Sequence, residues 1–187
     1  SIHAPVFSAI VQETPVQEDL APFIDKWNKA VKKLILVGVN EPNAIDAAVI
    51  ERLAVDQSVV VMTETTSNLY HKSFLGSIDT IITPFTHEDF EEWRPEILLT
   101  FGGMIVSKRV KAWLRKYAPA EHWHVDKLRA YDTFGCLTRH FKDDPDTFLN
   151  SFLSQVKPAE TNYQAMAEHV NAYRKVKQQE YLTKIPF

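Results

Sequence analysis

Residues 97–116 read ILLTFGGMIVSKRVKAWLRK, and this order of residue types predicts a buried strand, a turn and a helix. The apolar run at 97–101 is typical of a strand that is covered on both faces. Gly102 and Gly103 then interrupt the run, and Ser107 stands where a helix N-cap is expected. Beyond it, apolar residues recur at the spacing of one helix face: Val110, Trp113, Leu114 and Tyr117.

The rest of the chain alternates in the same way. Strands are predicted at 34–39, 59–62, 79–83, 122–125 and 137–141, and helices at about 44–55, 86–93 and 145–156. A helix carrying Phe23, Ile24 and Trp27 precedes the first strand. Because such alternation forms parallel βαβ units, we expect an α/β fold, a Rossmann-like three-layer sandwich with a mostly parallel central sheet. We expect three segments: an N-terminal connector (1–22), the α/β domain (23–157) and a C-terminal helical connector (158–187).

Two cations occupy the first turn of the helix predicted after Ser107. Lys108 and Arg109 lie where the helix dipole is already positive, which is unfavourable unless an anion is present. Residues 97–120 contain five cations and no acidic residue. We therefore expect Lys108 and Arg109 to bind an anion, with Gly102, Gly103 and Ser107 lining a cleft. A tight turn followed by a solvated basic helix face is the alternative.

Composition limits the class of protein. The chain has 187 residues, a formal net charge of −3 and one cysteine. A net charge of this sign does not attract nucleic acid or an anionic membrane. A single cysteine excludes a disulfide framework, and it fits a reducing compartment. No apolar run approaches the roughly 20 residues of a membrane helix, and the first residues do not resemble a signal peptide. We expect a cytoplasmic protein with no membrane span.

Two motifs are weak as sites. The turn after the first strand holds only Gly38, with Glu41 and Pro42 at the close-approach positions of a dinucleotide fingerprint, which makes classical nucleotide binding improbable. At the end of the second strand, where a dinucleotide fold places an acidic residue that binds the ribose, Glu64 is the one candidate. The motif HWHVD at 122–126 offers three possible metal ligands on one strand face, but no remote cluster completes it, so a polar sheet edge near the end of the strand is favoured.

Two further features have ordinary interpretations beside functional ones. Cys136 lacks a nearby catalytic histidine motif and is interpreted as a small core residue rather than a nucleophile. The polar loop 63–70, which contains Asn68, could line a ligand cleft or an interdomain seam, or it could be a simple turn. From these residues alone, the chain resembles a binding or scaffolding layer more than a complete catalyst.

Three segments in this order, TETTSNLY at 63–70, the stretch 96–115 and EHWHVD at 121–126, resemble a known family. They are similar to the middle domain of the MenD family, the 2-succinyl-5-enolpyruvyl-6-hydroxy-3-cyclohexene-1-carboxylate synthases of menaquinone biosynthesis. The resemblance covers about 31–150. It implies a three-domain parent enzyme, expected to be a homo-oligomer, that uses thiamine diphosphate and Mg²⁺ to decarboxylate 2-oxoglutarate and add the succinyl unit to isochorismate.

The resemblance also implies what this chain does. The cofactor belongs to the N- and C-terminal domains of the parent, and the Gly-Asp-Gly motif of the third domain is absent here. We therefore expect the chain alone to bind no cofactor or metal and to be inactive. Lys108 and Arg109 are expected near the active-site mouth, where they would neutralise substrate carboxylates. The alternatives are a free-standing FAD- or nucleotide-binding module and a metal-dependent hydrolase using His122, His124 and Asp126.

Overall fold

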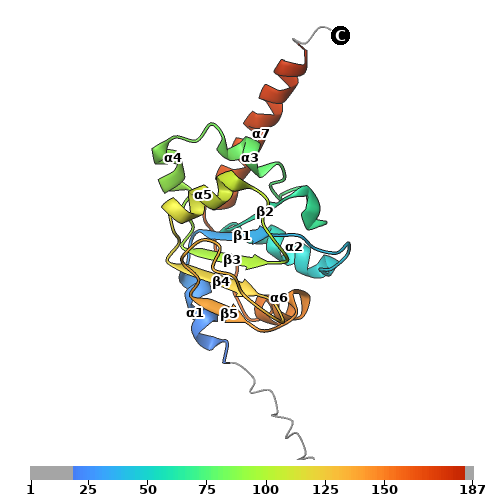
Figure 1. Ribbon diagram of the computed structural model, residues 1–187, viewed down its shortest axis with the longest axis vertical. Coiled ribbons are helices and arrows are strands. Elements are labelled where there is room, and N and C mark those ends of the chain that lie inside the picture. Colours follow the sequence, from blue (N-terminus) through green and yellow to red (C-terminus); the bar gives the residue numbers. More distant parts are fainter. Residues whose placement is uncertain (1–18, 184–187) are drawn as a thin grey trace, which may run out of the picture.

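Five parallel strands form the central sheet, in the order β2-β1-β3-β4-β5, in a computed structural model that describes residues 19–183 (Figure 1). The strands are β1 (Lys33–Val37), β2 (Val59–Thr63), β3 (Ile97–Phe101), β4 (Glu121–Val125) and β5 (Arg139–Phe141). Every residue of β1, β2 and β3 is buried, as expected for strands that are covered on both faces. The predicted parallel sheet is therefore confirmed.

Helices cover both faces of the sheet. One face packs on α1 (Ala21–Lys29), α2 (Ala47–Val55) and α6 (Pro145–Leu153), and the other on α3 (Ile78–Ile82), α4 (His87–Glu92), α5 (Lys108–Lys116) and α7 (Tyr163–Leu182). The alternation of strand side chains explains the two cores, since Ile35 and Val37 join one cluster while Leu34 and Leu36 join the other. The three-layer α/β sandwich is as predicted.

The strand predicted at 79–83 is wrong, because this segment lies in α3 and its C-cap. Ile78, Ile81 and Ile82 are buried against the second core, and their i, i+3, i+4 spacing fits a helix face. A short apolar run does not distinguish a strand from a buried helix turn, and this run supplied only five residues. The remaining predicted elements are present with shifted ends, such as β5, which begins only at Arg139.

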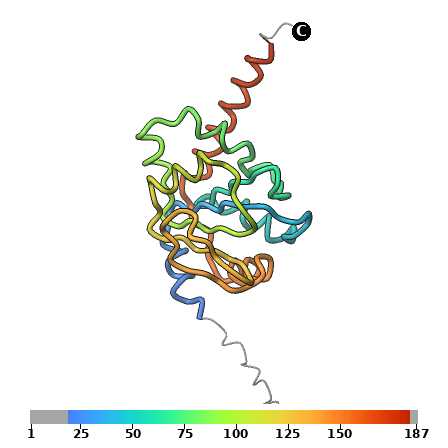
Figure 2. The backbone as a smooth tube through the Cα atoms, viewed as in Figure 1, coloured from blue at the N-terminus to red at the C-terminus, as the bar shows by residue number. Residues whose placement is uncertain are grey.

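The C-terminal helix α7 begins inside the domain and then leaves it. Tyr163 and Ala167 are fully packed into the second core, and the Tyr163 hydroxyl donates a hydrogen bond to the Trp93 carbonyl at 2.9 Å. The distal part of α7 projects away from the sheet, as the tube in Figure 2 shows. The connector predicted at 158–187 is thus helical over most of its length, and the parts of both predicted connectors at 1–18 and 184–187 lie outside the described residues.

Between residues 19 and 183, no helix has both the length and the apolar character needed to cross a membrane.

Candidate functional site

The expected ligand crevice of this sheet is closed by the protein's own backbone. With strand order 2-1-3-4-5, the connections change direction between β1 and β3, where ligands of doubly wound sheets usually bind. Here the Gly38 amide donates to the Phe101 carbonyl at 2.9 Å, and the Gly103 amide donates to the Val39 carbonyl at 2.7 Å. A Cβ atom at Gly38 would lie 2.0 Å from the Gly103 carbonyl oxygen. The lack of side chains at Gly38 and Gly103 therefore allows two loops to touch at this point, rather than a ligand to approach.

A carboxylate of the chain itself lies at the start of α5. The Glu64 carboxylate, which follows β2, accepts hydrogen bonds from the amides of Val106 at 2.8 Å and Ser107 at 2.6 Å. The Ser107 hydroxyl caps the helix by accepting from the Val110 amide at 3.0 Å, and it donates to Asp79. The negative charge that a helix N-terminus favours is thus already present. The sequence did not reveal this contact because Glu64 and Ser107 are 43 positions apart.

Lys108 and Arg109 lie exposed in the first turn of α5. Within the described part of the chain, neither has an ion-pair partner, and neither lines the cavity described below. Their predicted contact with substrate carboxylates stays a prediction. Asn68 is in the left-handed conformation (φ 48°), and its side-chain amide donates to the Asn40 carbonyl at 2.7 Å, so it joins two loops of the carboxyl edge.

A cavity of about 500 Å³ opens beside the closed crevice, at the carboxyl ends of β3 and β4. Gly102 and Gly103 line it, whereas Ser107 lies in a neighbouring depression with Glu64 and Asp79; their role in lining a ligand cleft stays a prediction. Its apolar walls include Phe101, Ile105 and Phe134.

Three cations also line this cavity: Lys111, Arg115 and Arg129. The Arg115 side chain is held in place because its Nε donates to the Thr133 carbonyl at 2.8 Å. None of the three is paired with a carboxylate among the residues the structure describes. Asp126 is the acidic member of the lining, and its carboxylate accepts the amides of Leu128 at 2.7 Å and Arg129 at 2.9 Å. The lining therefore carries a net positive charge.

Thr100 and two histidines form the polar part of the cavity lining. The Thr100 hydroxyl lies 2.9 Å from His122 Nε2 and 2.8 Å from His124 Nδ1. The hydroxyl can also donate to the Trp123 carbonyl at 3.4 Å, and because it has one proton it donates to at most one of these three partners. Burial, reinforced by the neighbouring His124, lowers the pKa of His122 to about 4, and burial also lowers the pKa of His124. Both rings are thus neutral near pH 7, and His122 Nδ1 has no hydrogen-bond partner in the described residues.

The candidate metal ligands of the HWHVD motif do not form a metal site. Over residues 19–183, no three or more His, Cys, Asp or Glu side chains are arranged to hold an ion. β4 is an interior strand, paired with β3 on one side and β5 on the other. The motif residues His122, His124 and Asp126 line the cavity, with His124 and Asp126 at or near the carboxyl end of β4. Cys136 packs at the margin of the second core, and burial raises the pKa of its thiol, which makes it a poor nucleophile.

Comparison with known proteins identifies the class. The family model described as "Middle domain of thiamine pyrophosphate" matches residues 9–183, and the chain belongs to this family of middle domains from thiamine pyrophosphate enzymes. Among its relatives, 2-succinyl-5-enolpyruvyl-6-hydroxy-3-cyclohexene-1-carboxylate synthase of Flavobacterium psychrophilum is 49% identical over 187 residues, which are 100% of this chain and 34% of that protein. The synthase of the same name from Flavobacterium johnsoniae is 51% identical over 94% of this chain and 32% of its own length.

A third synthase of this name, from Christiangramia forsetii, is 45% identical over 72% of the chain and 24% of its own length. The chain thus spans about a third or less of the curated relatives it matches. The resemblance predicted from the three sequence segments is confirmed, and the chain is a middle-domain fragment. A free-standing FAD- or nucleotide-binding module is not supported by these relatives, and the closed crevice between β1 and β3 agrees with that result.

Proposed function

We propose that this chain is the middle domain of a synthase that decarboxylates 2-oxoglutarate and adds the succinyl unit to isochorismate in menaquinone biosynthesis. The observation that carries the proposal is 49% identity to such a synthase along all 187 residues. The parent is expected to be a cytoplasmic homo-oligomer whose N- and C-terminal domains flank this one. It would use thiamine diphosphate and Mg²⁺ without contacting nucleic acid.

The described residues do not fit the cofactor themselves. The usual diphosphate position at the sheet switch point is closed by the Gly38–Gly103 contact, and residues 19–183 hold no carboxylate cluster for Mg²⁺. The role of this domain is then structural, with the cofactor held elsewhere in the parent. Calorimetry should show no binding of thiamine diphosphate with Mg²⁺ to the 187-residue chain, whereas the full-length parent should bind both and release CO₂ from 2-oxoglutarate. Cofactor binding by the chain alone would contradict this division of roles.

In the parent, Lys108 and Arg109 would contact the carboxylates of the substrates. Their exposure and lack of an ion-pair partner in the described chain support this role, because an unpaired arginine can bind a carboxylate with two parallel hydrogen bonds. Replacing both by Met in the full-length enzyme should raise KM for the substrate concerned about tenfold or more. Lys116→Met, at the other end of the same helix, is the matched control. Equal kinetics for the two variants would exclude the contact.

A second candidate function is binding of a small carboxylate in the cavity. The specific observation is that three cations without carboxylate partners surround apolar walls and a buried imidazole nitrogen that has no partner in the described residues. Calorimetry with benzoate and succinate would test aromatic and aliphatic forms of such a ligand. Arg115→Met should weaken binding about tenfold, whereas Lys116→Met, the adjacent residue outside the cavity, should not. Absence of binding, or equal loss in both variants, would refute this function.

A further inference from the structure

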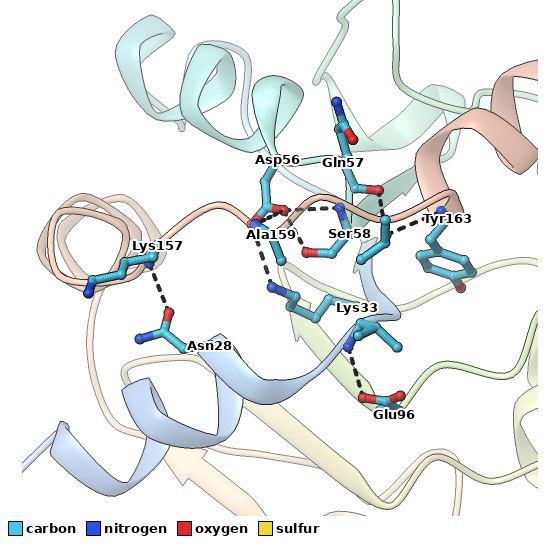
Figure 3. A network of polar contacts seen from close by, with 11 residues as sticks. Asn28, Lys33, Asp56, Gln57, Ser58, Glu96, Lys157, Ala159 and Tyr163 are labelled. Carbon is cyan, nitrogen blue, oxygen red and sulfur yellow. Dashed lines mark hydrogen bonds and ion pairs between the residues drawn. The ribbon is translucent and has the colours of Figure 1, made fainter.

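The chain crosses from one face of the sheet to the other between α6 and α7, and the polar contacts of this crossover are made to residues at the amino ends of the strands, such as Lys33 and Ser58 (Figure 3). We call residues 154–162 the crossover. At its start, the Lys157 amide donates to the Asn28 side chain at 2.8 Å, which joins it to α1. Near its end, the Thr161 hydroxyl donates to the Gln57 backbone carbonyl at 3.1 Å. The backbone N–H of Gln164, in the first turn of α7, donates to the same carbonyl at 2.9 Å.

A buried ion pair lies beneath the middle of the crossover. Lys33, at the start of β1, is completely buried, and its Nζ lies 3.5 Å from Asp56 Oδ2 and 5.0 Å from the centre of the Trp27 ring. The other carboxylate oxygen of Asp56 accepts from the Ser58 amide at 3.0 Å, the Ser58 hydroxyl at 2.5 Å and the Ala159 amide at 3.2 Å. Asp56 is therefore the group that joins the crossover to the buried lysine.

Breaking this buried pair by removing one partner is more costly than breaking a surface pair, because it leaves an uncompensated charge in the interior. A lysine with no exposure requires a nearby negative charge, because an unpaired buried ammonium is very unfavourable. Asp56 is consequently held in one position by Lys33 and Ser58, and a fixed carboxylate is a well-ordered acceptor for the Ala159 amide. The crossover thus has a rigid attachment point between its two other contacts.

We propose that the Lys33–Asp56 pair is a latch that holds the crossover on the sheet edge and so fixes the direction in which α7 leaves the domain. The first turns of α7, up to Val170, pack on the second core, and the Gln164 side chain donates to the Ala54 carbonyl at 2.9 Å, whereas the distal residues Tyr173, Val176 and Tyr181 are exposed. Release of the crossover would free α7 to reorient while the five-stranded sheet stays intact. The latch therefore controls the geometry between this domain and whatever α7 contacts.

Hydrogen exchange of the 187-residue chain, followed by mass spectrometry, tests the latch. Asp56→Asn should increase exchange in 157–170 about tenfold or more, as expected for loss of hydrogen bonds to a charged acceptor, while β1 and β3 stay protected. Asp46→Asn is the matched control, because it removes a carboxylate from the opposite end of α2 and asparagine remains a good N-cap. Unchanged exchange in 157–170, or an increase spread evenly over the strands, would overturn the proposal.

A second variant covers the case in which Asp56→Asn alone does not fold. The double variant Lys33→Met/Asp56→Asn removes the buried charge together with its partner, which proteins tolerate far better than an unpaired ion. In this double variant the strands should stay protected from hydrogen exchange, while residues 157–170 should exchange as fast as expected for Asp56→Asn. If the double variant is folded and 157–170 exchanges at the wild-type rate, the latch does not exist.

Discussion

Acidification should destabilise this domain through His122 before its carboxylates are titrated. The ring of His122 is 1% exposed, and burial lowers its pKa from 6.5 to about 4. Between these two values the unfolded chain binds a proton that the folded chain does not. Stability is therefore lost as the pH falls from about 6.5 toward 4, and it is fully regained above pH 7.

The size of the effect follows from the two pKa values. From pH 7 to pH 5, the free energy of unfolding should fall by about 2 kcal/mol, and by about 3 kcal/mol once the pH is below 4. A loss of about 2 kcal/mol corresponds to a decrease in Tm of about 5 °C for a domain of this size. His124, whose pKa is also lowered by burial, acts in the same direction.

Urea unfolding at pH 7 and pH 5 measures this difference, with tryptophan fluorescence as the probe, since all four tryptophans are buried. His122→Gln can keep the contact with Thr100 without titrating, and it should remove most of the pH dependence. His87→Asn, at an exposed position, should leave it unchanged. The reasoning is wrong if stability is flat between pH 7 and pH 5, or if the His122 ring protons titrate in NMR spectra at pH 6.5 or above.

Three further changes test other parts of the structure. Gly38→Ala should destabilise the fold by about 3 kcal/mol or more, measured by urea unfolding, because its Cβ would collide with the Gly103 carbonyl; a change below about 1 kcal/mol would contradict the closed crevice. Ser107→Ala should cost about 1 kcal/mol through loss of the α5 cap, whereas Ser107→Asp should retain the cap but place a charge beside Asp79. Cys136 should react with a thiol reagent more slowly than free cysteine at pH 8, because burial raises its pKa, and a faster reaction would show an activated thiol.

Local patterns in the sequence were sufficient for most of the fold. The apolar runs that became β1, β2 and β3 are buried on both faces, and the Ser107 cap is present as predicted. The segment in α3 was mistaken for a strand because its few apolar residues fit either structure until tertiary packing decides between them.

The site was less predictable because it depends on contacts between distant residues. The sequence indicated an anion at the start of α5, but it could not show that Glu64 would supply it. Lys108 and Arg109 attracted attention by their position in the first turn, whereas two of the three cations that line the cavity, Lys111 and Arg115, lie further along the helix, and the third, Arg129, follows β4. Helical spacing could have suggested this difference, since Lys111 and Arg115 are four residues apart and share one face.

The hydrogen bonds that Glu64 accepts from the Val106 and Ser107 amides make this carboxylate a tethered ligand of the start of α5. A group attached to the same chain competes at an effective concentration set by its loop, which is in the millimolar range for short flexible tethers. A phosphate or carboxylate in solution would have to displace Glu64 before using the same amides. These two hydrogen bonds therefore join the loop after β2 to the start of α5, and a free anion well below that effective concentration would displace Glu64 only rarely.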